Sequence, residues 1–313
     1  DQPTSQHRRQ PQLHGQCPQT IMLLFSAIAL TSTLVLRYAA HALILRGLRA
    51  PRLAHQRTPA DEGLSANTVR LHTVNGKTLF GWFVPVPGKA ACPAVVVMHG
   101  WGANASMMLP ALGPLHAAGF AVLLIDARCH GNSDDAAFTS LPRFAEDISA
   151  GLDWLLEQPS VDAKRLSIMG HSVGAAAALL CATKRPDVRA VISLSAFAHP
   201  RDIMRTFLTE AHIPYPVLGW YVMRHVQAVI GARFDDIAPI ASMALLRCPV
   251  LLVHGRDDEM VPFADAQSLL AAGSAGQAQC LCVSGGHDPS AALEAHIPAL
   301  IGFLKQSTSE ATH

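Results

Sequence analysis

The sequence predicts an α/β domain whose central sheet is mostly parallel and carries helices on both faces. Short apolar runs alternate along the chain with helix-length segments, which is the order that a parallel sheet requires. The interval 197–247 breaks this order, because it holds several apolar helical pieces interrupted by prolines and no clean strand. We expect this insertion to form a helical cap, with an ordinary helical excursion as the alternative.

The first two strands are expected at residues 67–74 and 77–85. Asn75-Gly76 lies between them and is typical of a two-residue hairpin turn, so this antiparallel pair should lie at one edge of the sheet. The continuous apolar runs expected of buried strands are 93–98, 121–125, 165–169, 190–194, 249–253 and 279–283. The helix-length segments between them are 106–118, 141–156, 173–183 and 263–272.

Composition excludes several classes of protein. The 313 residues include 24 Lys+Arg and 23 Asp+Glu, and 50% of them are hydrophobic. A net charge of +1 argues against a nucleic-acid-binding protein, and the apolar content is too high for a disordered chain. The seven cysteines form no C-x-x-C pair, which argues against a disulfide framework and against a zinc site.

The N-terminal region divides into three predicted segments. Residues 1–19 are polar, and residues 20–36 form an uncharged apolar run close to the minimum of about 17 residues for a membrane-spanning helix. We interpret this run as a single-pass anchor, with a signal peptide or a soluble helix as alternatives. More arginines follow the run than precede it, which mildly favours a cytoplasmic catalytic domain. Residues 37–66 are predicted to be a linker, and residues 67–313 the main domain.

A nucleophile motif lies between a predicted strand and a predicted helix. Residues 168–175 read IMGHSVGA and match G-x-S-x-G, with Ser172 at its centre. A sharp strand-to-helix turn exposes the serine hydroxyl, and glycines on both sides avoid clashes of Cβ atoms. We interpret Ser172 as a nucleophile, with a structural turn as the alternative.

With this motif in its context, the chain from Asn67 to Lys305 resembles the α/β-hydrolase superfamily, which includes serine esterases and serine aminopeptidase-like hydrolases. The segment His99-Gly100-Trp101-Gly102 is similar to the oxyanion loop of that superfamily. The resemblance implies that the backbone amides of Trp101 and Val173 form the oxyanion hole.

Two later motifs complete the resemblance. Residues 254–262 follow the pattern HG-x-x-D-x-x-V-P, which implies that Asp258 is the acid and leaves Asp257 as its rival. His287 follows two glycines after the last apolar run, where the superfamily carries its base. Residues 126–133 are similar to D-x-R-G-H-G-x-S, with Cys129 in place of the usual glycine, and we interpret them as a fold-supporting loop.

Ser172, Asp258 and His287 therefore predict a serine hydrolase of the carboxylesterase type, acting on a small-molecule ester through an acyl-enzyme. This mechanism requires no metal and no organic cofactor. A serine aminopeptidase-like or amide hydrolase is the alternative, followed by a lysophospholipase or a non-catalytic binding protein on the same scaffold. Five residues of the cap are candidates to line an apolar pocket, with core packing as the alternative: Met204, Phe207, Trp220, Tyr221 and Met223.

Overall fold

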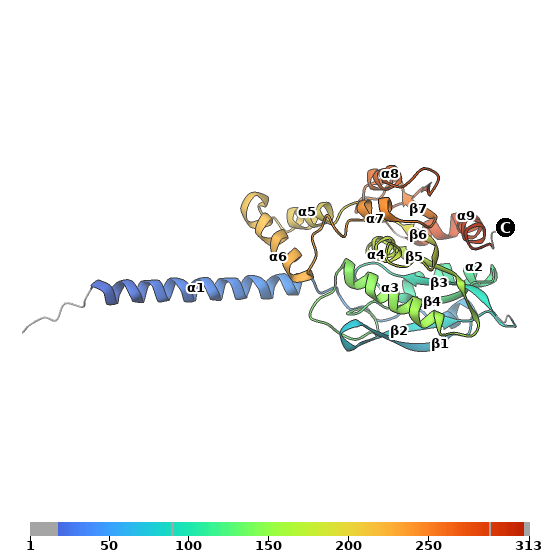
Figure 1. Ribbon diagram of the computed structural model, residues 1–313, viewed down its shortest axis with the longest axis horizontal. Helices are drawn as coiled ribbons and strands as arrows, with labels where there is room; N and C mark the ends of the chain where they lie inside the picture. The colour runs from blue at the N-terminus through green and yellow to red at the C-terminus, as the bar shows by residue number, and fades with distance from the viewer. Residues whose placement is uncertain (1–17, 89–90, 288, 310–313) are drawn as a thin grey trace, which may run out of the picture. The chain divides into compact units, whose positions relative to one another are not determined.

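The computed structural model describes residues 18–88, 91–287 and 289–309 (Figure 1). It comprises two compact units, Asp1–Ile44 and Leu45–His313, which are taken separately below. Of the polar segment predicted over residues 1–19, residues 1–17 lie outside the described residues.

The described part of the N-terminal unit is helical. It belongs to helix α1 (Pro18–Gly47), whose last residues, 45–47, fall in the second unit. The stretch Gln19–Gly47 has a mean hydropathy of 1.8, and none of its most apolar window is buried. Within the described part of the chain, α1 alone is long and apolar enough to cross a bilayer. The helix extends beyond the predicted run 20–36 because the residues that follow include several alanines and leucines, which are strong helix formers.

The second unit is built on an eight-stranded sheet with the strand order β1-β2-β4-β3-β5-β6-β7-β8. Strand β2 pairs antiparallel with both β1 and β4, and every other neighbouring pair is parallel. The strands are β1 (Asn67–Thr73), β2 (Lys77–Val84), β3 (Cys92–Met98), β4 (Ala121–Ile125), β5 (Val161–His171), β6 (Val188–Leu194), β7 (Val250–Gly255) and β8 (Ala278–Val283). The predicted sheet class and the hairpin at its edge are confirmed.

Two local predictions differ from the structure. The hairpin turn contains three residues, Val74–Gly76, since Thr73 pairs with Lys77, and within it Asn75 and Gly76 adopt left-handed conformations with φ of 62° and 65°. The helix predicted over 106–118 is instead a 3₁₀ turn, Ala105–Ala111, followed by the short helix α2 (Leu112–Ala117). Pro110 lacks the N–H that a continuous helix would need at that point.

Helices cover both faces of the sheet, as predicted (Figure 1). Strand β3 lies in the middle of the sheet and is buried on both sides, so its side chains alternate between the two layers. Val95 and Val97 join the apolar cluster of α2 and α9, whereas Val96 lies against Gly151 of α3. The helices of these layers are α3 (Leu141–Leu156), α4 (Val173–Ala182), α8 (Phe263–Ala272) and α9 (Pro289–Thr308).

The insertion predicted over 197–247 is helical. Helices α5 (Pro200–Glu210) and α6 (Trp220–Ile230) both pack on a π turn, Tyr215–Gly219, and stand apart from the layers on the sheet (Figure 1). The last helix, α7 (Pro239–Leu245), packs instead against α4 and α8. The cap therefore consists of α5, the π turn and α6, while α7 belongs to the body of the domain.

Part of the predicted linker is attached to the domain. Residues 48–57, here called the strap, have no helix or strand but are hydrogen-bonded to loops more than 45 positions later in the sequence. Most of these bonds join the strap to residues 104–106 and 126–139. Such a segment has no hydrophobic periodicity, which explains why its sequence resembles that of a free linker.

Candidate active site

Ser172 lies at a sharp turn between β5 and α4. Its φ of 54° and ψ of −118° are unusual for a residue with a side chain, and its amide donates to the carbonyl of Leu194 at 2.8 Å. A Cβ on Gly170 would lie 2.3 Å from the carbonyl oxygen of Gly174, and one on Gly174 would lie 2.3 Å from that of His99. Both glycines are therefore required for the chain to turn this tightly.

Asp258 and His287 are hydrogen-bonded to each other. His287 Nδ1 lies 2.8 Å from Asp258 Oδ2, and the Asp258 side chain is fully buried while that of His287 is 18% exposed. Because a carboxylate only accepts hydrogen bonds, the proton of the imidazole is on Nδ1 and Nε2 is left as a base. The amides of Met260 and Val261 hold the other carboxylate oxygen, at 3.0 and 2.8 Å. The neighbouring acid, Asp257, is exposed.

His171 links the Ser172 turn to the loop of His287. Its Nε2 donates to the main-chain carbonyl of His287 at 2.9 Å, and the two imidazole rings are 4.9 Å apart. The hydroxyl of Ser172 has no hydrogen-bond partner among the described residues, so it is not directly bonded to His287 here. Catalytic hydrogen bonds often tighten only when substrate binds. The sequence pattern singled out the position of Ser172 but gave His171 no role.

The segment after β3, residues 99–106, contains the predicted oxyanion segment 99–102, is here called the oxyanion loop after that prediction, and lies beside Ser172. A Cβ on Gly100 would lie 3.2 Å from the Cβ of Ser172, so the turn that carries Trp101 is in direct contact with the nucleophile position. The amides of Trp101 and Val173 have no acceptor among the residues that the structure describes. An oxyanion hole requires two such unpaired N–H groups near the nucleophile, so these amides are compatible with the predicted role.

Two buried histidines fix the peptide that carries the Trp101 N–H and the peptide that follows it. His99 Nδ1 donates to the carbonyl of Gly100 at 2.7 Å, and its Nε2 accepts from the amide of Ala127 at 3.0 Å. His130 Nε2 accepts from the amide of Gly102 at 3.1 Å. The Gly100 carbonyl belongs to the same peptide as the Trp101 N–H. The sequence placed His130 in a fold-supporting loop, and these hydrogen bonds specify what each of the two histidines holds.

Burial keeps both histidines neutral. Burial lowers the pKa of His130 to about 3 and also lowers the pKa of His99. The hydrogen bonds agree, since each ring uses one nitrogen as a donor and the other as an acceptor: His130 Nδ1 donates to the carbonyl of Arg128 at 3.0 Å. A protonated ring would have no acceptor for the Gly102 amide.

The loop after β4, residues 126–135 and here called the β4 loop, supports the fold as the sequence suggested. Arg128 is fully buried and bonds to Asp147 of α3, with Nη2 2.6 Å from Oδ1. Cys129 has a φ of 67°, so this position does adopt the conformation that favours the glycine usual in the motif. The side chain of Asp126 accepts hydrogen bonds from the amides of Ala105 and Asn132, both at 2.8 Å.

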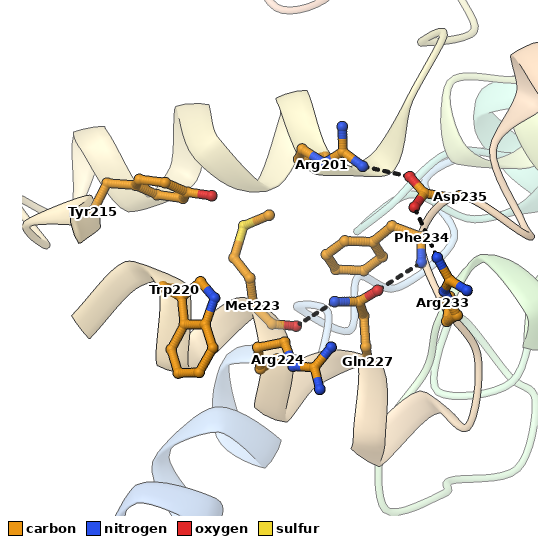
Figure 2. Close-up of a pocket in the computed structure, with 9 residues that line it drawn as sticks. All are labelled: Arg201, Tyr215, Trp220, Met223, Arg224, Gln227, Arg233, Phe234 and Asp235. Carbon is orange, nitrogen blue, oxygen red and sulfur yellow. Dashed lines mark hydrogen bonds and ion pairs between the residues drawn. The ribbon is translucent and has the colours of Figure 1, made fainter. Parts of the chain in front are cut away.

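The cap contains a cavity of about 200 Å³ between α5 and α6 (Figure 2). It is lined by Arg201, Tyr215, Trp220, Met223, Arg224, Gln227, Arg233, Phe234 and Asp235. Trp220 and Met223 are among the five cap residues predicted to line an apolar pocket, and the other three predicted residues are absent from this lining. Arg201 and Arg233 both pair with Asp235, so the cavity is more charged than the sequence suggested. None of the residues predicted to be catalytic lines it.

The described residues contain no cluster of three or more His, Cys, Asp or Glu side chains arranged to hold a metal ion. The polar groups next to Ser172 are backbone amides and the imidazole of His171, whose ring lies 4.9 Å from that of His287. Such a set suits the stabilisation of negative charge on a substrate oxygen.

Comparison with known proteins agrees with the fold described above. The family model described as serine aminopeptidase, S33, matches residues 89–230. The structure resembles the Pyrococcus furiosus esterase Pf2001 with a TM-score of 0.67 and 20% sequence identity, covering 83% of this chain and 100% of the esterase. The chain has the α/β-hydrolase fold.

Two curated relatives extend the comparison to sequence. The chain is 28% identical over 241 residues to the uncharacterized protein Rv2307c of Mycobacterium tuberculosis, covering 76% of this chain and 79% of the relative. It is also 25% identical over 235 residues to the alpha/beta hydrolase domain-containing protein WAV2 of Arabidopsis thaliana, covering 72% of each chain.

Because His130 is neutral in the folded protein, we predict that the protein loses stability in acid. Below its ordinary pKa of 6.5 the unfolded chain takes up a proton that the folded chain binds only near pH 3. The free energy of unfolding should therefore fall with decreasing pH, by up to about 1.4 kcal/mol per pH unit from this group. When the free energy of unfolding is measured by urea denaturation between pH 7 and pH 5, it should depend less steeply on pH in His130→Gln than in the wild type. Equal slopes would contradict the buried neutral ring, and His72→Gln, at an exposed histidine of β1, is the control.

Proposed function

We propose that this α/β hydrolase is a serine hydrolase that cleaves carboxylic esters through an acyl-enzyme. Ser172 is the nucleophile, His287 the general base and Asp258 the residue that orients the base. The observation that carries the proposal is the 2.8 Å bond between His287 and Asp258, on a loop that His171 ties to the Ser172 turn. Esterases among the solved structures of similar fold support the ester class.

In the first half of the reaction, His287 Nε2 removes the proton of Ser172 as its oxygen attacks the ester carbonyl. The charge on the imidazolium is stabilised by the buried carboxylate of Asp258. The carbonyl oxygen becomes an oxyanion and accepts hydrogen bonds from the amides of Trp101 and Val173. Each such donor is worth about 3 kcal/mol of barrier.

In the second half, the imidazolium gives its proton to the departing alcohol, which leaves an acyl group on Ser172. Water then attacks the acyl-enzyme with His287 again acting as the base, and the acid is released. Each step is a proton transfer or an acyl transfer, so the side chains and amides named above are sufficient for the whole cycle.

Amide cleavage is the second candidate, because the family model that matches residues 89–230 is described as a serine aminopeptidase. An amide needs the same nucleophile and oxyanion hole. It differs from an ester in its leaving group, since an amine departs only after His287 has protonated it. The choice therefore depends on the groups that hold the substrate beyond its carbonyl.

A substrate panel separates the two candidates. We expect p-nitrophenyl esters of short and medium acyl chains to be hydrolysed with a kcat/KM at least about 100-fold above that of aminoacyl p-nitroanilides. Steady-state kinetics on the full-length protein measures this ratio. Higher activity on the anilides would overturn the ester assignment and favour the aminopeptidase.

Substitutions of the two neighbouring acids test the assignment of roles. Asp258→Asn should lower kcat by about 10³- to 10⁴-fold, because the amide cannot hold His287 in the required tautomer. Asp257→Asn is the matched control and should retain nearly full activity, since that side chain is exposed. The opposite ranking would show that Asp257 is the functional acid. Ser172→Ala should abolish both turnover and labelling by a fluorophosphonate probe.

We also propose that α1 anchors the protein in a membrane, with the hydrolase domain on the cytoplasmic side. The length and hydropathy of Gln19–Gly47 support the anchor, and the arginines that follow the apolar run support the orientation. A tethered hydrolase would meet esters that partition into the bilayer surface.

Membrane fractionation tests the anchor. The full-length protein should remain in the membrane pellet after an alkaline carbonate wash, whereas a chain that begins at Leu45 and keeps the strap should be soluble and active. Release of the full-length protein by the wash, or recovery of a protein from which the apolar run 20–36 has been removed, would contradict an uncleaved anchor. Protease added to sealed vesicles of known orientation then tests which side carries the domain.

A further inference from the structure

The strap contacts both loops on the oxyanion side of the candidate site. These are the oxyanion loop, residues 99–106, and the β4 loop, residues 126–135. The strap precedes the first strand of the domain and contains none of the motifs that predict the active site. Three independent sets of contacts join it to these loops.

The first set belongs to Arg52. Its Nη1 donates to the carbonyls of Gly131 at 2.6 Å, Ser133 at 2.8 Å and His130 at 3.3 Å. Its Nη2 bonds to the carboxylate of Asp135 at 2.9 Å. One guanidinium thus fixes the backbone of the β4 loop at the residue whose imidazole holds the amide of Gly102.

The second set belongs to His55. Its Nε2 donates to Asp126, with Oδ2 at 2.9 Å, and its ring packs against both Phe80 and Trp82 with centroid distances of 5.1 and 4.5 Å. Only 9% of the His55 side chain is exposed and none of that of Asp126. The same carboxylate accepts from the amide of Ala105, so His55 shares an acceptor with the far end of the oxyanion loop.

The third set joins the strap to the oxyanion loop directly. The side chain of Asn104 donates to the carbonyls of Leu53 and Ala54, at 2.9 and 3.2 Å. The ring of Pro51 lies against Gly102, where an added Cβ would be 3.0 Å from Pro51 Cγ. The φ of 69° at Gly102 is a second reason for glycine at this position.

We propose that the strap is a positioning element of the oxyanion hole, and that Arg52 and His55 are positioning residues that act on the Trp101 amide. Arg52 acts through His130, which holds the next peptide, and His55 acts through Asp126, which holds the amide of Ala105. This inference rests on the proposed function, because it assigns to the strap a role in the same acyl transfer.

The proposal predicts an effect on the transition state rather than on substrate binding. The oxyanion exists only after Ser172 has attacked, so a displaced Trp101 amide weakens a hydrogen bond that the bound substrate does not yet make. Loss of a positioning residue should therefore lower kcat and leave KM nearly unchanged.

The test uses the full-length protein with Arg52→Ala, Arg52→Lys, His55→Ala and His55→Gln. The matched controls are Arg57→Ala, at an arginine of the strap that pairs with Glu62, and His72→Ala, at an exposed histidine of β1. Active sites are counted by complete fluorophosphonate labelling, so that kcat on p-nitrophenyl butyrate refers to folded enzyme alone. The inhibition constant of an alkyl trifluoromethyl ketone, which forms an oxyanion on the serine, is measured in parallel.

We expect the two alanine variants at Arg52 and His55 to lower kcat per active site by about 10-fold or more, with KM changed less than about two-fold. The inhibition constant of the ketone should rise by the same factor as kcat falls. His55→Gln should recover much of the activity, because its amide can still donate to Asp126. Arg52→Lys should recover little, since an ammonium lacks the planar fork that reaches several carbonyls. Both controls should match the wild type.

Two results would overturn the proposal in distinguishable ways. If the strap variants lose only thermal stability or active fraction, while kcat per active site and ketone inhibition stay at wild-type values, the strap is purely structural. If the wild type is not labelled at Ser172, or if Ser172→Ala keeps full activity, the proposed function fails and the inference with it. If Ser172 is labelled but the strap variants keep the wild-type kcat and ketone inhibition, only the inference about the strap fails and the proposed function stands.

Discussion

The backbone conformation at Ser172 is the constraint on which the candidate site depends. A residue with a side chain is held at positive φ so that β5 can pass directly into α4. This turn leaves no room for side chains at Gly170 and Gly174, and it brings the carbonyl of His99 against the first turn of the helix. The nucleophile position and the oxyanion loop are therefore packed together by one steric requirement, before any substrate is present.

The sequence predicted the parts of this arrangement that follow from pattern. Apolar runs and helix-length segments identified the sheet, and G-x-S-x-G identified the turn, because both depend on local periodicity or on glycines at fixed spacing. The spacing after His254 selected Asp258 over Asp257, and the structure places the buried Asp258 against His287 while Asp257 is exposed. The direct bond from Ser172 to His287 remains part of the proposal.

Other features depend on contacts between distant segments, and no local sequence pattern predicts them. The strap has neither helical nor strand periodicity, so only the pairing of its polar groups with loops much later in the chain distinguishes it from a free linker. The roles of His99 and His130 depend on which nitrogen meets which backbone group, and the helix boundary at α2 depends on prolines within an apolar segment. In each of these cases the local structure was determined by packing between distant parts of the chain.

The central claim is that Ser172, His287 and the amides of Trp101 and Val173 act on one carbonyl. The most direct test is a crystal structure of the protein after reaction with a fluorophosphonate. The account predicts phosphorus bonded to Oγ of Ser172, with its oxygen within about 3 Å of both amide nitrogens and His287 Nε2 facing Oγ. A phosphonyl group on another residue, or its oxygen turned toward solvent with both amides unoccupied, would contradict it.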